Sequence, residues 1–287
     1  MKQNFSAKRS LYLVAFVLLS ITCSPTHGDV LDDVLAAQSG QVQARYSSRH
    51  PKETLSLFGI EAGMTVIEAF PGGGWYTDIL LPFLGPKGQL IGADYAFDMY
   101  PKFNFYGEDY LAAKKTWAKT WTESAMRRHG HLGAKIGAFP LGSMTADVDG
   151  KADAVLLIRA LHNLARFEND GGYLSTALKE IHRALKPGGV VGVVQHIAPE
   201  EAPDSWADGS NGYLKKSFVV STMNSAGFEL VSDSDINLNP ADKPQEGDIV
   251  WRLSPAFATS RNDENLRNQL REIGESTRMT LLFRKSN

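Results

Sequence analysis

The residues most capable of chemistry lie in one short stretch, where an apolar run ends at an acid and then at three consecutive glycines. Val66–Ala69 is apolar apart from Glu68 and is typical of a buried strand, Gly72–Gly74 follows, and a helical apolar pattern resumes at Trp75. A strand, a glycine loop and a helix let backbone N–H groups approach a ligand at a helix N-terminus. The acid favours a ligand with hydroxyl or amino groups, such as a nucleoside cofactor. A purely structural turn explains the glycines by themselves equally well.

A second acid, Asp94, ends the next predicted strand, Gln89–Asp94. A carboxylate at that position can accept hydrogen bonds from both ribose hydroxyls of a nucleoside that lies across the strand ends. An isolated aspartate more often caps a helix or a turn. Its place after the glycine loop favours the ribose.

Further polar residues follow the strongly apolar strand predicted at Ala152–Arg159. His162 could deprotonate a hydroxyl or an amine, since the pKa of histidine lies near neutrality, and Asn163 could hold that acceptor by hydrogen bonds. A histidine that merely caps the next helix is the structural alternative. Arg159 is expected to pair with a carboxylate, of a ligand or of the protein, and His196 ends the fifth strand at the same edge.

Alternating strands and helices must position these residues, which favours βαβ units and a parallel sheet. Strands are predicted at Thr65–Ala69, Gln89–Asp94, Lys135–Phe139, Ala152–Arg159, Val190–His196, Phe228–Ser232 and Thr280–Arg284. Helices are predicted at Trp75–Leu84, Glu108–His129, Tyr173–Leu185 and Ser217–Ala226. Residues 29–60 form a helical lead-in, Lys186-Pro187-Gly188-Gly189 is a stop signal after a helix, and much of 200–265 is an irregular lid or loop region.

The N-terminus has the pattern of a secretory signal peptide, residues 1–28. Lys2, Lys8 and Arg9 precede the apolar run Leu11–Leu19, which is short for a permanent membrane anchor, and small residues precede a cleavage site after Gly28. We therefore expect a periplasmic or secreted protein, 29–287, with no integral membrane span. An uncleaved anchor, or a lipid attached to Cys23, is the alternative.

Composition narrows the ligands and partners. Cys23 is the only cysteine, so the cleaved chain would hold neither disulfides nor cysteine-ligated metal, and the closest pair of histidines, His129 and His131, lacks metal-site spacing. No metal is expected. The net charge of −2 becomes more negative once the basic leader is removed, and no basic run follows, which excludes nucleic acid as the expected partner. A small-molecule acceptor is expected; the sequence indicates no oligomeric state.

An ordered series of motifs resembles class I S-adenosylmethionine-dependent methyltransferases. The series runs Glu68…Gly72-Gly73-Gly74, then Ile91-Gly92-Ala93-Asp94, then Ala152–Leu157, then Leu185-Lys186-Pro187-Gly188-Gly189 with the strand after it. Two further phrases, His162-Asn163 and Asn239-Pro240-Ala241-Asp242, are similar to those of a secreted bacterial branch of that superfamily.

The resemblance implies a Rossmann-like α/β fold with a mostly parallel seven-stranded sheet, a C-terminal antiparallel hairpin and helices on both faces. It implies S-adenosylmethionine as the cofactor. The implied cofactor-binding residues are Glu68, Ala69, Phe70, Gly72, Gly73, Gly74 and Asp94, and the implied catalytic residues are His162 and Asn163. The chain departs from the family at Phe70, where a glycine is usual, so that the ring either crowds the methionine end of the cofactor or packs beneath the loop.

The expected function is methyl transfer to an unidentified small molecule outside the cytoplasm, with catalysis mainly by positioning. A non-catalytic exported binding protein with the same fold is the alternative, which Phe70 and the export signal favour and which Glu68 and Asp94 oppose. A nicotinamide-dependent oxidoreductase would share the strand, loop and helix, but Gly72–Gly74 lacks the wider G-x-G-x-x-G spacing.

Overall fold

The computed structural model describes residue 1, residues 27–130 and residues 133–286. Apart from Met1, His27 and Gly28, the predicted signal peptide lies outside the described residues. Among the described residues no helix is both long enough and apolar enough to span a membrane.

Strands and helices alternate through the first two thirds of the chain, as the sequence predicts. The strands are β1 (Thr65–Ala69), β2 (Gln89–Asp94), β3 (Lys135–Pro140), β4 (Ala152–Ile158), β5 (Leu185–Ala198), β6 (Leu214–Lys215), β7 (Phe228–Ser234) and β8 (Arg278–Lys285). The α-helices are α1 (His27–Ala36), α2 (Gly40–Gln43), α3 (Tyr46–Arg49), α4 (Pro51–Leu57), α5 (Trp75–Leu84), α6 (Glu108–Lys114), α7 (Trp117–His129), α8 (Leu161–Arg166), α9 (Glu168–Gly171), α10 (Tyr173–Ala184), α11 (Lys216–Ser225) and α12 (Glu264–Ile273). The 3₁₀ helices among the described residues are η1 (Phe97–Phe103), η3 (Ala146–Val148) and η4 (Val250–Arg252).

The strands form one sheet in the order β3-β2-β1-β4-β5-β8-β7, and the two-residue strand β6 pairs with the end of β5. The pairs from β3 to β5 are parallel, whereas β8 runs antiparallel to both β5 and β7. This is the expected Rossmann-like arrangement, a mostly parallel sheet with an antiparallel C-terminal pair. The pair is not a tight hairpin, because residues 235–277 lie between its strands.

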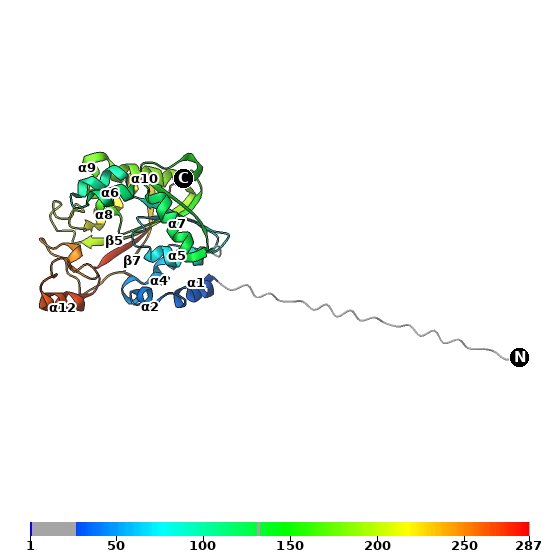
Figure 1. Cartoon of the computed structure of the whole chain (residues 1–287), viewed down its shortest axis with the longest axis horizontal. Helices are drawn as coiled ribbons and strands as arrows, with labels where there is room; N and C mark the ends of the chain where they lie inside the picture. The colour runs from blue at the N-terminus through cyan, green and yellow to red at the C-terminus, as the bar shows by residue number, and fades with distance from the viewer. Residues whose placement is uncertain (2–26, 131–132, 287) are drawn as a thin grey trace.

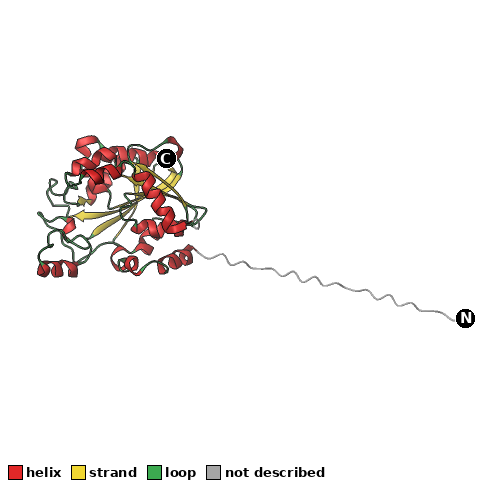
Figure 2. Cartoon of the chain, viewed as in Figure 1, coloured by secondary structure: helices red, strands yellow, loops and turns green. Residues whose placement is uncertain are grey.

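Helices cover both faces of the sheet (Figure 1, Figure 2), and alternate residues of each strand pack against them. Val66 of β1 belongs to a core shared with α1, α4, α5 and α7. Ile67, the next residue, belongs to a core shared with η1, α8, α10 and α11. The alternation places Glu68 on the α5 side of the sheet.

The two faces also explain why the helix predicted at Glu108–His129 is in fact two helices. Leu111 of α6 packs on the η1 side of the sheet, whereas Trp121 of α7 packs on the α5 side. One straight helix does not reach both faces. The indole of Trp121 lies 2.9 Å from where a Cβ on Gly92 would be, so β2 needs a glycine there.

Two other boundaries differ from the prediction. The stop signal ends α10 as expected, but Lys186–Gly189 already belongs to β5, in which a shift of register against β4 lies beside Gly188 at φ +72°. The segment predicted as irregular between Asn237 and Asn265 contains η4 and leads into α12, a largely polar helix without a strong apolar signal. Asp263 caps that helix through the backbone N–H of Leu266 at 2.9 Å.

Candidate active site

A cavity of about 980 Å³ lies at the carboxyl ends of β1, β4 and β5. This edge, where the connections on either side of β1 diverge, is where open α/β sheets bind ligands. The first wall is the end of β1 with its glycine loop, and the second is the end of β4 with α8. The N-terminal helices, residues 249–261 and the residues just before β8 complete the cavity.

Glu68 opens onto this cavity. Its side chain is buried, and Oε2 accepts a hydrogen bond of 2.6 Å from the hydroxyl of Thr77 on α5. The hydrogen bonds that act on this carboxylate come from Thr77, through its hydroxyl and through its backbone N–H. Burial raises the pKa of Glu68 to about 7, and the nearby charge of Asp78 adds to the rise, while the Thr77 hydrogen bond opposes it. The carboxylate can therefore take one further donor, which fits the hydroxyl or amino group that its position predicts.

The glycine loop divides into two parts. Gly72 and Gly73 line the cavity, but Gly74 does not. Gly74 has φ +84° and begins α5, and a Cβ there would lie 2.7 Å from Nη1 of Arg128. Its assignment as a cofactor contact stays a prediction, and the structure gives a second reason for the glycine, because the backbone turns left-handed under Arg128. Gly73 has no such reason, since a Cβ there would meet no protein atom within 4 Å.

Phe70 holds a conformation that usually requires glycine. Its φ is +52°, its ring stacks on Tyr95 with the centroids 4.2 Å apart, and it lines the cavity beside Ala69. The ring thus packs against Tyr95, just after β2, and also forms part of the cavity wall, while its crowding of the methionine end of the cofactor stays a prediction. The left-handed backbone at the family's glycine position explains how the motif survives the substitution.

Asp94 does not line the cavity, and its role as the ribose acceptor stays a prediction. Its Oδ1 accepts hydrogen bonds from the Tyr100 hydroxyl at 2.6 Å and from the backbone N–H of Tyr95 at 2.9 Å. Its Oδ2 forms an ion pair of 2.7 Å with Nζ of Lys114, which lies over the Tyr100 ring. The aromatic residues of η1 and the loop after it supply this enclosure. The carboxylate is fully satisfied within the protein.

His162 and Asn163 do lie together in the cavity wall, at the start of α8. Nδ1 of His162 lies 3.3 Å from Oε1 of Gln195, whose amide nitrogen donates to the carbonyls of His196 and Gly212. The amide oxygen therefore faces the imidazole, so Nδ1 carries the proton and Nε2 is an acceptor. Burial lowers the pKa of His162 to about 4, which keeps the ring neutral at pH 7.

The amide nitrogen of Asn163 is hydrogen-bonded, whereas its amide oxygen is not. Its Nδ2 donates to the hydroxyl of Tyr95 at 3.2 Å, and Tyr95 donates in turn to the carbonyl of Ala160. The Oδ1 atom is buried and has no partner among the described residues. A buried acceptor of this kind costs free energy unless a ligand donates to it.

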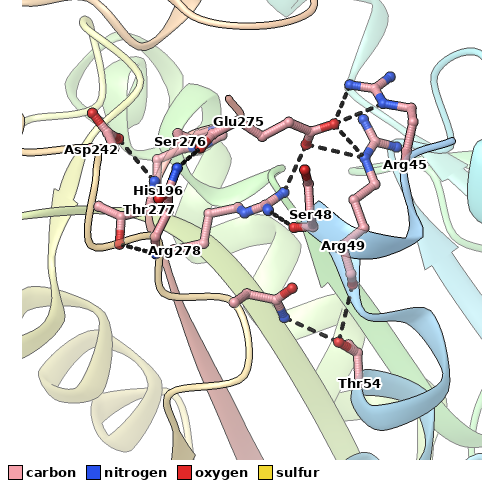
Figure 3. A network of polar contacts seen from close by, with 12 residues as sticks. Arg45, Ser48, Arg49, Thr54, His196, Asp242, Glu275, Ser276, Thr277 and Arg278 are labelled. Atoms are coloured by element: carbon pink, nitrogen blue, oxygen red, sulfur yellow. Dashed lines mark hydrogen bonds and ion pairs between the residues drawn. The ribbon is translucent and has the colours of Figure 1, made fainter. Parts of the chain in front are cut away.

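Sequence reasoning missed the residues that bring both ends of the chain to the cavity. Arg45 and Arg49, from the N-terminal helices, line it together with Glu275 and Ser276, which precede β8. The spacing of the two arginines, four residues apart in a helical stretch, was the available signal. Glu275 is their common partner (Figure 3), through Nε of Arg45 at 2.7 Å and Nε of Arg49 at 3.1 Å.

The phrase Asn239-Pro240-Ala241-Asp242 holds this second group in place. Nδ2 of Asn239 donates to the carbonyl of Glu275 at 2.7 Å. Asp242 accepts from the backbone N–H of Thr277 at 2.8 Å and forms an ion pair of 2.8 Å with Arg252. Part of the region predicted as irregular, the phrase Asn239–Asp242, therefore fixes one wall of the cavity.

Within the region 200–265, which the sequence predicts as an irregular lid or loop, residues 200–212 pack against the site. A Cβ on Gly209 would lie 2.1 Å from the carbonyl oxygen of His162, so the backbones of this segment and α8 are in direct contact at a glycine with φ +95°.

Among the described residues no group of three or more acidic, histidine or cysteine side chains could hold a metal ion.

No family model and no curated protein matches the chain. Solved structures do match. The [4+2]-cyclase SpnF is 15% identical, with a TM-score of 0.51 over 92% of this chain and 97% of that one. A SAM-dependent methyltransferase from Aquifex aeolicus is 16% identical, with a TM-score of 0.48 over 72% and 93%.

A third match is the 1,6-didemethyltoxoflavin-N1-methyltransferase of Burkholderia thailandensis, a structure with bound S-adenosylhomocysteine. It is 11% identical, with a TM-score of 0.45 over 95% of this chain and 99% of that one. Similarity at these identities concerns the fold alone: the chain has a Rossmann-like fold, as its own strand order shows. The function has to be argued from the site.

Proposed function

We propose that the protein is an S-adenosylmethionine-dependent methyltransferase, of the secreted bacterial branch, that acts on a small molecule outside the cytoplasm. The fold and strand order are those expected for this activity. The export component rests on the basic and apolar pattern of residues 1–28, and N-terminal sequencing of the protein recovered from the periplasm or medium tests it.

One observation carries the proposal: Gly73 lines the cavity together with Glu68, and a Cβ at residue 73 would meet no protein atom within 4 Å. Protein packing gives no reason for a glycine at residue 73, and a ligand that approaches the backbone closely does. Glu68 supplies an acceptor for the amino group of such a ligand. Both features lie at the end of β1, where the sequence predicts the cofactor.

The cofactor fits one half of this region better than the other. Glu68, Gly72 and Gly73 fit its amino acid portion. Asp94 would meet the ribose only after the ammonium of Lys114 leaves it and η1 moves, because the carboxylate is enclosed by protein donors. When bound, S-adenosylmethionine supplies an electrophilic methyl group on sulfur.

The acceptor would lie against α8. Nε2 of His162 is an unprotonated acceptor in this wall, and Oδ1 of Asn163 is an unpartnered one. Both can orient an acceptor hydroxyl or amine, and His162 can receive its proton as the methyl group transfers. Because the pKa of His162 is lowered, the base is available at pH 7 but weak, so positioning supplies most of the rate.

A second candidate function is the binding of a small molecule without catalysis. The enclosed Asp94 and the ring of Phe70 in the cavity wall favour it, since both oppose a nucleoside in the usual place.

Calorimetric titration of the full chain with S-adenosylmethionine and S-adenosylhomocysteine separates the two functions. We expect saturable binding that Glu68→Gln weakens about tenfold or more, since a hydrogen bond to a charged group is lost. Asp94→Asn tests whether the ribose reaches β2. Failure of the wild-type protein to bind either compound would sink the methyltransferase proposal and leave the binding protein.

A further inference from the structure

Four arginines surround one glutamate at the N-terminal side of the cavity, and we call them the arginine cluster: Arg45, Arg49, Arg159 and Arg278. Figure 3 shows Arg45, Arg49 and Arg278 converging on Glu275 from three segments of the chain. Nη1 of Arg278 lies 3.1 Å from Oε2 of Glu275, and Nε of Arg49 lies 3.1 Å from Oε1. The single carboxylate therefore already serves three guanidinium groups.

Arg159 is the fourth member and has no carboxylate. It lines the cavity at the end of β4, and among the described residues its guanidinium makes neither a hydrogen bond nor an ion pair. The charges of Arg278, Glu275 and Arg45 all act on its pKa, which burial lowers to about 10. The expected pairing of Arg159 with a protein acid is thus corrected, because Glu275 is occupied by the other three.

The arginine cluster and Glu275 together carry a net charge of +3, from four guanidinium groups and one carboxylate. The neighbouring titratable groups supply no compensation. His196 and His162 are neutral, because burial lowers the pKa of each, and Tyr76 is a neutral phenol whose pKa is raised. Of the other acids that line the cavity, Asp78 pairs with Arg128, and Glu68 lies beside Thr77. Uncompensated cations in a partly buried site are costly unless an anion binds.

The backbone of Arg159 adds a second sign of function. Its φ is +56°, a left-handed conformation, and its N–H donates to the carbonyl of Val194 at 2.7 Å. A bulky residue in this region is strained, and such strain is concentrated at ligand sites. An asparagine or glycine would adopt this conformation more easily, so packing does not explain the choice of arginine.

Ser276 completes the polar surface near the cluster. It lines the cavity, and its hydroxyl lies 2.6 Å from Nδ1 of His196. A serine nucleophile would need His196 to take a proton among four arginines, which their charge opposes. Ser276 is therefore better suited to hydrogen-bond a ligand than to attack one.

We propose that the arginine cluster binds the carboxylate or phosphate group of an organic anion, and that this anion is the methyl acceptor. The planar guanidinium of Arg159 matches the geometry of either group. The assignment as acceptor rests on the proposed methyltransferase function, whereas the anion site does not. Its position beside His162 and Asn163 places the remainder of the anion where the methyl group would be received.

Titration calorimetry of the full chain with inorganic phosphate and with succinate tests the site. We expect saturable binding of at least one of them, and a loss of affinity of about tenfold or more in Arg159→Gln, since a charged hydrogen-bond donor is removed. Arg166→Gln is the matched control. Arg166 lines the same cavity but lies over the ring of Phe167, outside the cluster, and its removal should leave the affinity within about twofold.

Folding and ligand identity are controlled separately. Thermal unfolding of Arg159→Gln shows whether the variant is folded, and Arg159→Asn, which relieves the left-handed backbone, should be at least as stable as the wild type. Saturating S-adenosylhomocysteine and 5′-methylthioadenosine, which lacks the amino acid carboxylate, are then added in turn.

Phosphate or succinate binding that persists beside S-adenosylhomocysteine supports an acceptor site. Loss of that binding with S-adenosylhomocysteine but not with 5′-methylthioadenosine would show that the cluster holds the cofactor's own carboxylate, and would overturn the assignment. Absence of binding by both anions, or equal weakening by Arg159→Gln and Arg166→Gln, would overturn the site itself. If the chain binds anions but no cofactor, the proposed methyltransferase function fails and the anion site stands.

Discussion

Glu68 and Asp94 are the same kind of residue in nearly the same place, yet their surroundings are opposite. Both are buried carboxylates at the carboxyl ends of adjacent parallel strands, with exposed fractions of 4% and 2%. Asp94 receives two hydrogen bonds and an ammonium ion from its own chain. Glu68 is hydrogen-bonded by Thr77 and faces a cavity.

The difference teaches that a strand end fixes where a carboxylate lies, while the donors around it decide its use. Lys114 compensates the charge of Asp94, so that acid stabilises the fold around η1. Glu68 has no cation in hydrogen-bond contact, and its pKa is raised to about 7 by burial. The acid without a cation is the one that a ligand can use.

Among the changes that test this contrast, removal of the Asp94 charge should have the largest effect on stability. Asp94→Asn leaves the ammonium of Lys114, whose side chain is only 13% exposed, without a carboxylate. We expect a destabilisation of about 3–5 kcal/mol, measured by chemical denaturation. Lys114→Met in the same chain should restore part of it, because the uncompensated charge is then absent. A loss below about 1 kcal/mol would contradict a structural role for Asp94.

Glu68→Gln should stabilise the fold where Asp94→Asn destabilises it, and the size of its effect on the free energy of unfolding should depend on pH. The folded-state pKa of Glu68, about 7, lies above the ordinary value of 4.5, so the folded state holds the proton longer and the stability contribution falls as pH rises from 4.5 to 7. Glutamine can still accept from Thr77. We expect the variant to be more stable than the wild type at pH 8, by up to about 3 kcal/mol, and no more stable near pH 4. Denaturation curves at both pH values measure this, and a pH-independent difference would refute the raised pKa.

A third test asks whether the cavity at Glu68 and Gly73 is a ligand site. Gly73→Ala adds a methyl group that meets no protein atom, at a residue with ordinary backbone angles. Cofactor affinity should fall about tenfold, by steric exclusion of a ligand at the backbone, while stability stays within about 0.5 kcal/mol. Gly137→Ala in β3 is the control, since a Cβ there would make only ordinary contacts of 3.7 Å or more and neither Gly137 nor its chain neighbours line the cavity. Equal affinities of the two variants would show that no ligand approaches residue 73.

The smallest expected effect concerns Phe70, which lies between the two acids along the chain. Phe70→Gly and Phe70→Ala both remove the ring that stacks on Tyr95, but only glycine relieves the left-handed backbone at φ +52°. The glycine variant should be the more stable of the two by about 1 kcal/mol in denaturant. If alanine proved as stable as glycine, the backbone at residue 70 would not be left-handed.

The sequence was sufficient for the sheet, because β-branched runs, glycine turns and helical periodicity are local properties. It also indicated Glu68, His162 and Asn163, which lie at strand ends or just after them. It did not indicate the partner of Asp94, since Lys114 lies 20 residues away on a helix whose docking depends on η1. Nor did it indicate the arginine cluster, because Arg45 and Glu275 are 230 residues apart and meet only in the folded chain.

That separation has a consequence for how the protein folds. Glu275 joins α3, among the first helices, to the segment before β8, the last strand, so one wall of the cavity forms only when both ends of the chain have docked. Contacts of such high sequence separation are slow to form, and during synthesis Arg45 and Arg49 wait for almost the whole chain to emerge. A ligand of this cavity would bind no partly folded form, and each tenfold excess over its dissociation constant would oppose global unfolding by about 1.4 kcal/mol.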